Sequence, residues 1–222
     1  SPTDNIVLLV LRELGAGTVF YVNDNEIASA GGTTFTDLNE TEAAFTVKPG
    51  MTIPAGTVLV LPWGGAPVDE TNYTWNASSG GMGNNNEEIY VYTAAAITDT
   101  TPISFIYGVS IGTSPSQRPS GLTSGTTFIE PPPSGTAAAS RYKIAGATYT
   151  STTNGLLAAI GDVANNWETA ASYTITVADW TFTIVNPAAE PTVQASTITF
   201  PDVQASEIDV AWTSGNGANR LV

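Results

Sequence analysis

Hydrophobic and polar residues alternate over short stretches along most of the chain, which is the pattern of half-buried β-strands. Thr, Val, Ile and aromatic residues fill these stretches, and Gly, Asn, Pro and Ser separate them, as is typical of strands joined by turns. A longer apolar run at residues 6–11 favours a strand buried on both faces. The predicted strands lie at residues 6–11, 18–22, 42–48, 57–61, 73–75, 88–92, 103–107, 126–129, 173–177 and 180–185.

One segment has helical spacing instead. Leu156, Leu157 and Ile160 recur at intervals of one turn, residues 151–154 offer oxygens for an N-cap, and Gly161 suits the position after the last turn. This pattern predicts one short helix near residues 153–161. About ten short strands, one helix and frequent turn residues predict an all-β fold, and we expect a β-sandwich over residues 1–186.

The C-terminal part of the chain has a different organisation. Residues 186–191 contain two prolines and no large apolar residue, which predicts a linker over 187–195. Residues 196–200 and 207–212 then alternate apolar and polar positions, so we expect an extension of two or three strands over 196–222.

Composition excludes several classes of protein. The 222 residues include 6 Lys+Arg and 20 Asp+Glu, for a formal net charge of −14, with no His and no Cys. A chain without these two residues has no Ser-His-Asp or Cys-His catalytic machinery, no disulfides and no His-ligated metal. Six scattered cations cannot track a phosphate backbone, and no apolar run reaches the length of a membrane helix. We therefore expect a protein that is not an enzyme, binds no nucleic acid and does not insert into a membrane.

The same composition bears on location. Few lysines, an excess of acidic residues and abundant Thr, Asn and Gly are typical of extracellular bacterial β-proteins. A net negative charge also keeps such a protein soluble and repels anionic surfaces. The predicted location is extracellular, at the cell surface.

Two stretches resemble known modules. The C-terminal stretch PTVQASTITFPDVQASEIDVAWTSGNGANRLV resembles the opening of a fibronectin type III module of secreted bacterial proteins, with its Ile198/Phe200 strand, its Ile208-x-Val210-x-Trp212 strand and a Gly-Asn-Gly turn. The resemblance covers only the first strands of such a module, because a complete one needs seven strands.

Residues 5–185 resemble a lamin-tail-like β-sandwich module found in multi-domain surface proteins of Bacteroidota-type bacteria. The motifs that carry this resemblance are GAGTVFYVNDNE, IPAGTVLVL, ISFIYGV and RYKIAGATYTSTTNGLLAAIGDVANNW. The resemblance implies an extracellular spacer or display unit, and it implies no activity, because a fold does not fix a function.

One polar stretch is a candidate metal site. Asn23, Asp24, Asn25 and Glu26 follow a predicted strand, and their oxygens are of the kind that Ca²⁺ binds. Asp69-Glu70 and the acidic stretch 84–88 could add ligands from other loops. The alternative is an ordinary solvated turn, since Asn and Asp favour turns by bonding to their own backbone. Calcium is the one cofactor that the sequence brings into consideration.

Aromatic residues near the Gly-rich loop suggest a second kind of site. Trp63, Tyr73 and Trp75 could stack on sugar rings, which would make the chain a carbohydrate-binding or targeting module of a larger secreted enzyme. The alternative is that these rings fill the core, because Trp is usually largely buried.

The C-terminal strands suggest a third site, for contact between subunits. A two-stranded segment cannot bury its own apolar side chains, so it is a candidate for pairing with a strand edge of a neighbouring subunit. The residues of this predicted contact are Ile198, Phe200, Ile208, Val210 and Trp212. Repetition of such a contact builds a filament, and we predict a structural subunit of a bacterial surface filament or adhesin that self-associates. The alternative is that the sequence is part of a longer protein whose neighbouring modules cover these strands.

Overall fold

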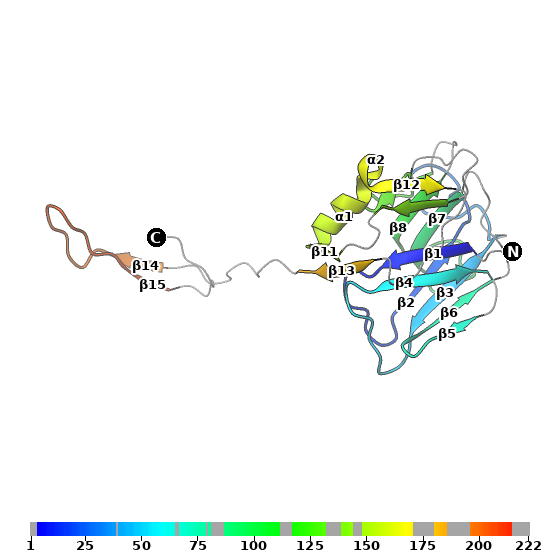
Figure 1. Cartoon of the computed structure of the whole chain (residues 1–222), viewed down its shortest axis with the longest axis horizontal. Helices are drawn as coiled ribbons and strands as arrows, with labels where there is room; N and C mark the ends of the chain where they lie inside the picture. Colours follow the sequence, from blue (N-terminus) through cyan, green and yellow to red (C-terminus); the bar gives the residue numbers. More distant parts are fainter. Residues whose placement is uncertain are drawn as a thin grey trace. The chain divides into compact units, whose positions relative to one another are not determined.

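The structure is a computed structural model that describes residues 4–38, 40–64, 67–78, 80, 87–111, 117–131, 139–143, 148–170, 180–185 and 196–214. The chain divides into two compact units, Ser1–Val185 and Asn186–Val222. Strands dominate the described residues and helices are few (Figure 1), which confirms the predicted all-β fold. The predicted linker, 187–195, lies outside the described residues.

The first unit contains thirteen strands and two helices in its described part. The strands are β1 (Asp4–Leu9), β2 (Val19–Asn23), β3 (Glu42–Val47), β4 (Val58–Trp63), β5 (Val68–Asp69), β6 (Tyr73–Ala77), β7 (Glu87–Thr93), β8 (Ser104–Ile111), β9 (Phe128–Ile129), β10 (Ala139–Tyr142), β11 (Thr148–Ser151), β12 (Trp167–Ala170) and β13 (Thr181–Ile184). The helices are α1 (Thr153–Gly161) and α2 (Val163–Asn166). The second unit contains β14 (Ser196–Thr199) and β15 (Ala211–Thr213).

A seven-stranded sheet in the order β5-β6-β3-β2-β7-β8-β9 forms the larger layer of the first unit. Its strands pair in antiparallel fashion except for β8 and β9, which are parallel. The strand β2 lies near the middle, with β3 on one side and β7 on the other. Residues far apart in sequence therefore become neighbours along β2.

The antiparallel pair β1–β4 packs against one face of this sheet and completes the sandwich. Alternation decides which side chains point inward, because successive residues of a strand face opposite sides. The buried core between the layers contains Ile6, Val10, Phe20, Val22, Ala43, Phe45, Val47, Ile53, Leu59, Leu61, Trp63, Trp75 and Val91.

The other face of the sheet is covered by loops. Ile27 and Phe35, from the loop after β2, and Leu122, from the loop before β9, pack with Tyr90 and Tyr92 of β7. Residues Ile27 and Phe35 form an isolated β-bridge, and the Phe35 N–H donates to Thr100 O at 2.9 Å. The central strands are therefore buried on both faces, although only one face meets another sheet.

The predicted short helix is confirmed as α1. The Thr152 Oγ1 accepts a hydrogen bond from Gly155 N at 3.1 Å, which satisfies one of the free N–H groups at the helix start. Leu156 is fully buried and anchors the helix to the unit. The one-turn helix α2 follows directly, and the sequence pattern did not predict it.

Two short ribbons complete the first unit: β10 pairs with β12, and β11 pairs with β13. The pairing of β11 with β13 is parallel. Residues 173–177 and 180–185 are two successive predicted strands. The segment 173–177 lies outside the described residues, and the described partner of β13 is β11.

Phe45 provides a test of the core packing. Its ring stacks on Phe20 at a centroid distance of 4.6 Å and on Tyr73 at 4.9 Å, and it is fully buried. We expect Phe45→Ala to lower the free energy of unfolding by about 3–5 kcal/mol, because it removes these contacts and leaves a cavity. Urea denaturation measures the loss. As a control, Ile103→Ala at a side chain 74% exposed should change stability by less than about 0.5 kcal/mol.

Candidate functional site

Acidic and amide side chains gather where three strands of the large sheet meet. Because β2 is antiparallel to both neighbours, its last residue lies beside the first residue of β3, and the residues that follow β2 run toward the start of β7. Asn23 is accordingly paired with Glu42 on one side and with Tyr90 on the other. The acidic residues that follow β2, precede β3 and begin β7 are thus brought to one end of the sheet by the strand order.

Asp24 is the most deeply placed of these acids. It is 4% exposed, and its Oδ1 accepts a hydrogen bond from the Thr41 N–H at 2.8 Å. Burial raises the pKa of the Asp24 carboxyl, and the hydrogen bond from Thr41 opposes this effect. A buried carboxylate held by a backbone donor has a fixed position, which a ligand site requires.

Amide and backbone groups fix the loop around Asp24. The Asn25 side chain is fully buried, donates to Glu42 Oε1 at 3.1 Å and accepts from the Glu40 N–H at 3.2 Å. Gly80 leaves room for Thr41, because a Cβ at position 80 would lie 1.8 Å from Thr41 Oγ1. These contacts hold residues 40–42 against the end of β2.

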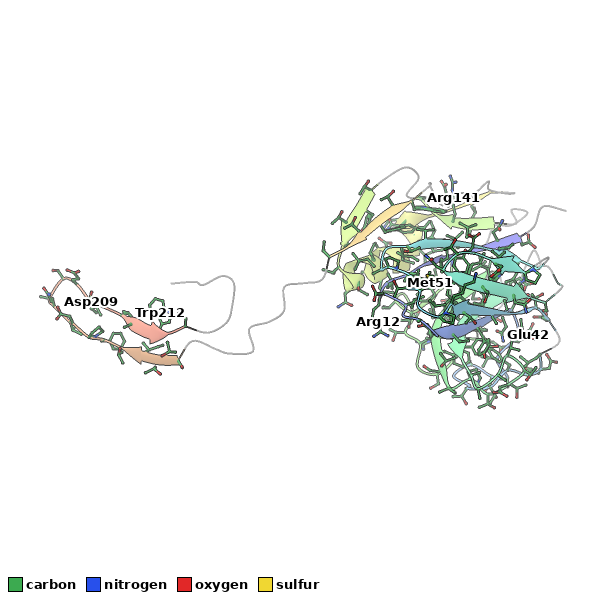
Figure 2. The ribbon with its side chains drawn as sticks, turned by 90° about the horizontal axis from the view of Figure 1, so that it is seen from below. Arg12, Glu42, Met51, Arg141, Asp209 and Trp212 are labelled. Carbon is green, nitrogen blue, oxygen red and sulfur yellow. The ribbon has the colours of Figure 1, made fainter. Side chains whose placement is uncertain are left out.

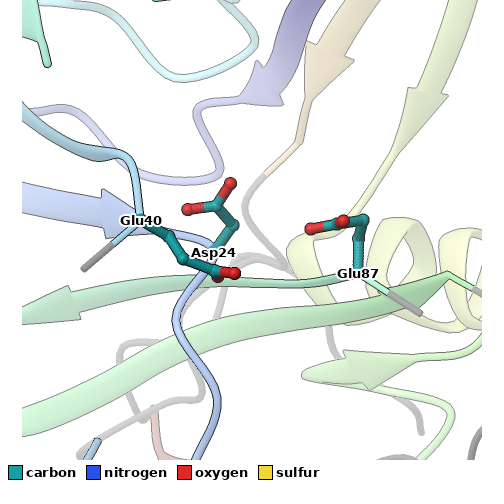
Figure 3. Close-up of side chains that lie close together, drawn as sticks. All are labelled: Asp24, Glu40 and Glu87. Atoms are coloured by element: carbon teal, nitrogen blue, oxygen red, sulfur yellow. The ribbon is translucent and has the colours of Figure 1, made fainter. Parts of the chain in front are cut away.

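Three carboxylates come together at this place, and we call Asp24, Glu40 and Glu87 the acidic cluster. One oxygen of each lies within 4.8 Å of an oxygen of the other two. Figure 3 shows the three side chains converging from the end of β2, from the residues before β3 and from the start of β7. Asp24 is buried, Glu87 is half-buried and Glu40 is exposed.

The charges of the cluster disfavour full ionisation. Partial desolvation of the Glu40 carboxyl, followed by the negative charges of Glu26, Asp24, Glu87 and Asp37, raises the pKa of Glu40 to about 7. The folded protein therefore holds a proton at Glu40 at pH values where an unperturbed glutamate has lost it. A bound cation would favour the opposite, fully ionised state.

Glu88 belongs to a different environment, although it follows Glu87 directly. Neighbouring residues of a strand point to opposite faces, and Glu88 is 7% exposed and accepts a hydrogen bond from Gln117 N at 3.2 Å. Burial raises the pKa of the Glu88 carboxyl, and the Gln117 N–H opposes this effect. Glu88 is therefore held by the loop before β9 and is not part of the acidic cluster.

Carboxylates arranged in this way can ligate a hard cation. Ca²⁺ takes six to eight oxygen ligands in flexible geometry, and the acidic cluster offers three carboxylates, one of them exposed to solvent. Water and further oxygens would have to complete the shell. Asp24 itself is only 4% exposed, which limits direct contact between its carboxyl and a substrate.

The structure brings together only some of the residues of the predicted calcium site. Of the four consecutive residues Asn23–Glu26, only Asp24 belongs to the acidic cluster; Asn23 and Asn25 are buried beside it, and Glu26 is exposed. Asp69 lies elsewhere, on β5, where it forms an ion pair with Lys48 at 2.8 Å. Of the predicted stretch 84–88, Glu87 belongs to the acidic cluster, Glu88 does not, and residues 84–86 lie outside the described residues.

The sequence reasoning missed Glu40 as a member of the cluster. Glu40 is separated from Asp24 by sixteen positions, and only the pairing of β2 with β3 brings the two together. The available signal was the antiparallel pairing expected of two successive strands, which would have placed the residue before β3 next to the residue after β2.

The predicted sugar-binding aromatic residues are not available for stacking. Trp63 and Trp75 are 2% and 1% exposed, and their ring centroids lie 6.5 Å apart inside the core. The Trp75 Nε1–H donates to Pro62 O at 2.7 Å, and Tyr73 stacks on Phe45. Trp63 and Trp75 therefore fill the core, which is the alternative that the sequence offered, and neither ring can form a carbohydrate platform; Tyr73 is half-buried beside them.

Comparison with known proteins found no matching protein-family model, no matching curated protein and no matching solved structure. The resemblances to lamin-tail-like and fibronectin type III modules therefore stay predictions. Within the described part of the chain, neither helix has the length and apolar character that crossing a bilayer requires.

The raised pKa of Glu40 makes stability depend on pH. A carboxyl whose pKa is higher in the folded than in the unfolded chain makes the protein less stable as the pH rises between the two values. These values are 4.5 and about 7 for Glu40, so we expect stability to fall over this interval. Glu40→Gln should raise the Tm at pH 8 by about 2–4 °C, after allowance for solvent screening, and should have little effect at pH 4.5.

Differential scanning calorimetry in a chelator-containing buffer measures both Tm values. Glu13→Gln is the matched control, because it removes the same charge at an exposed position that is not in the acidic cluster. An equal effect of the two substitutions on the Tm at pH 8 would show that the loss of one negative charge anywhere on the protein, and not the acidic cluster, causes the change.

Addition of calcium tests whether the acidic cluster binds a cation. With a dissociation constant of about 10⁻³ M, as in extracellular modules, about 10 mM Ca²⁺ adds roughly 1.4 kcal/mol of stability. We expect the Tm of the unmodified protein to rise accordingly at pH 8 and that of Asp24→Asn to stay constant. A Tm that is unaffected by Ca²⁺ in both proteins would argue against a cation site here.

Proposed function

We propose that this chain is a non-enzymatic structural subunit of a bacterial surface filament or adhesin, and that it assembles by strand sharing through its C-terminal hairpin. The C-terminal hairpin is the segment 196–213, which contains β14 and β15. The observation that carries the proposal is the exposure of the apolar side chains along this hairpin.

Backbone pairing in the hairpin extends from its base to its turn. Ser196 pairs with Thr213, Thr199 pairs with Ala211, and Val203 forms an isolated bridge with Ile208. The Gln204 N–H donates to Glu207 O at 2.8 Å and closes the turn. The segment therefore has defined strand structure and presents its side chains in a fixed pattern.

The apolar side chains of the hairpin are exposed to solvent. Five of them lie between 47% and 64% exposed, and they are Ile198, Phe200, Val203, Ile208 and Val210. Trp212, on β15, is half-buried (Figure 2). Complete burial of one such side chain is worth roughly 1.5–3 kcal/mol, so a partner that covers several of them gains a large driving force. Several exposed apolar side chains on one short segment are typical of an interaction site.

The strand edges of the hairpin are also available. Among the described residues, β14 and β15 pair only with each other, and each therefore has one outer edge with unpaired N–H and C=O groups. Pairing with a strand of another subunit would satisfy these groups and bury the apolar side chains at the same time. This combination favours strand sharing over a contact made by side chains alone.

Composition supports the extracellular setting of the proposal. The chain contains no cysteine that the oxidising conditions outside the cell could modify, and its net charge is −14. Its abundant threonines suit strands, and its 21 glycines suit the turns between them. A structural subunit that repeats along a surface needs stable sandwiches and an adhesive segment, and the proposal assigns these roles to the two units.

Substitution in the hairpin tests the proposal. Ile208→Ser combined with Val210→Ser should lower the self-association constant by at least about tenfold, since each change removes roughly 1.5 kcal/mol or more of apolar burial. Light scattering coupled to size-exclusion chromatography gives the mass of the particles over a range of protein concentrations. The expected result is multimers for the unmodified chain and monomers for the double variant.

Ile103→Ser is the matched control, because it removes an isoleucine that is 74% exposed on the first unit. It should leave the mass distribution unchanged. The proposal would be contradicted if the unmodified chain were monomeric at every concentration and mass spectrometry showed residues 196–214 to be intact.

A further inference from the structure

We infer that the base of the C-terminal hairpin has two conformations, a bulged one in the free chain and a straight one when the hairpin is shared with a partner strand. This inference rests on the proposed function and names the change within the hairpin that accompanies strand sharing. It follows from one strained residue, from the strand register and from the side chains that a straight register would pair.

Thr197 of β14 has a backbone conformation that threonine rarely adopts. Its φ angle is 55°, and among the described residues it is the one residue other than glycine with a positive φ. In this region the Cβ atom comes too close to the backbone, and a β-branched side chain is especially unfavourable there. The Thr197 side chain is exposed, so close packing of this side chain does not impose the conformation. Thr197 is therefore strained at a place where its side chain has room to move.

The strained residue lies in a β-bulge. Ser196 pairs with Thr213, and the next pair joins Thr199 to Ala211. Two residues of β14 therefore lie opposite a single residue of β15. A bulge whose first residue is in the left-handed region normally has glycine at that position. The hairpin has Thr197 there, so the bulge costs free energy that glycine would spare.

A straight register at the base would remove both the bulge and the strain. The register of the Thr199 pair, continued without an extra residue, sets Ile198 opposite Trp212. The next pair is then Thr197 with Thr213. An aromatic residue opposite a β-branched one, and two threonines opposite each other, are favourable cross-strand pairs. The straight register would also give Thr197 an extended backbone, which suits a β-branched residue.

The apolar face of the hairpin is the same in both conformations. Opposed residues of an antiparallel ribbon share a face, and successive residues of a strand alternate between faces. Ile198 and Trp212 are each next to a residue of the Thr199–Ala211 pair, so both point to the face opposite to that pair. The pair is common to both registers. The change therefore alters the base of the hairpin and leaves its exposed apolar side chains on one face.

The two conformations differ in how well they pair with another strand. A bulge bends its strand and increases the local twist, and bulges are one of the devices that keep a strand from pairing with other chains. A straight strand offers its N–H and C=O groups in the regular order that strand addition uses. A partner strand therefore binds the straight form better and shifts the hairpin toward it. Assembly releases the strain at Thr197 in the same step.

Two engineered disulfides fix one conformation each, because the chain has no cysteine of its own. Ser196→Cys with Thr213→Cys, the bulged lock, joins residues that are opposite each other in the bulged register. Thr197→Cys with Thr213→Cys, the straight lock, joins residues that are opposite each other in the straight register. Opposed residues have the Cα separation that a disulfide requires, and oxidation at low protein concentration forms the bond within one chain.

Light scattering coupled to size-exclusion chromatography compares the two locks over a range of protein concentrations. We expect the self-association constant of the bulged lock to be lower than that of the straight lock by about tenfold or more, since release of the strain no longer contributes. A reducing agent should abolish the difference. The comparison is matched, because both locks carry Thr213→Cys and differ by one position in the second cysteine.

Thr197→Gly checks the same step without a cross-link. Glycine tolerates a positive φ, so this substitution stabilises the bulged form and should weaken self-association. Thr199→Gly is the matched control, because it makes the same change in the same strand at a residue whose φ is not positive. The effect of Thr199→Gly should be smaller. An equal loss from both substitutions would contradict the role of Thr197, because it would trace the loss to the lower strand propensity of glycine.

The outcomes separate the inference from the proposed function. Multimers of the unmodified chain, together with weaker association of the bulged lock, support both. Multimers of the unmodified chain with equal association of the two locks, or with stronger association of the bulged lock, would overturn the change of conformation and leave the proposed function in place. Monomers of the unmodified chain and of both locks at every concentration would overturn the proposed function and the inference with it.

Discussion

The packing of the β1–β4 pair on the seven-stranded sheet is the constraint on which the rest of the first unit depends. The chain has no cysteine, so no disulfide limits the unfolded state, and burial of apolar surface has to provide the stability. Trp63 of β4 and Trp75 of β6 contribute from opposite layers, and a hydrogen bond from Trp75 to Pro62 O ties the layers together. The same packing removes these two rings from the surface, so one set of residues cannot both hold the sandwich and bind a sugar.

The position of the acidic cluster follows from the sheet order. β2 lies between β3 and β7, and antiparallel pairing sets the end of β2 beside the start of both neighbours. Asp24 is buried there because Phe20 and Val22 hold β2 in the core, and its backbone partner Thr41 comes from the turn into β3. Desolvation of the Glu40 carboxyl and, after it, repulsion from the neighbouring carboxylates oppose this arrangement, as the raised pKa of Glu40 records. The hydrophobic contacts of the central strands outweigh that cost.

The sequence could predict the features that depend on a local pattern, but not those that depend on long-range strand pairing. The helix over 153–161 was predictable because Leu156 and its capping residue Thr152 lie within one short segment. Most strands of the sandwich were predictable from alternation, but β5, β10, β11 and β12 were not. The strand order was not predictable either, because pairing joins residues such as Gly108 and Phe128 that no local signal connects. Asp24 was identified as a candidate ligand from its neighbours in sequence. Glu40 was not, because it reaches the cluster through the register of β2 and β3.

Net charge limits how copies of this chain can meet. At −14, two copies repel each other over most approaches, and the repulsion is strongest near clustered acids such as Asp24, Glu40 and Glu87. A contact between copies must therefore combine local apolar burial with a place where the charge is less negative. The C-terminal hairpin has exposed Ile208 and Val210 for such burial, and its described residues carry Asp202, Glu207 and Asp209 but no Lys or Arg. Under the proposed function, apolar side chains therefore provide the attraction between copies and the net charge of −14 opposes it, so added salt, which screens the repulsion, favours association.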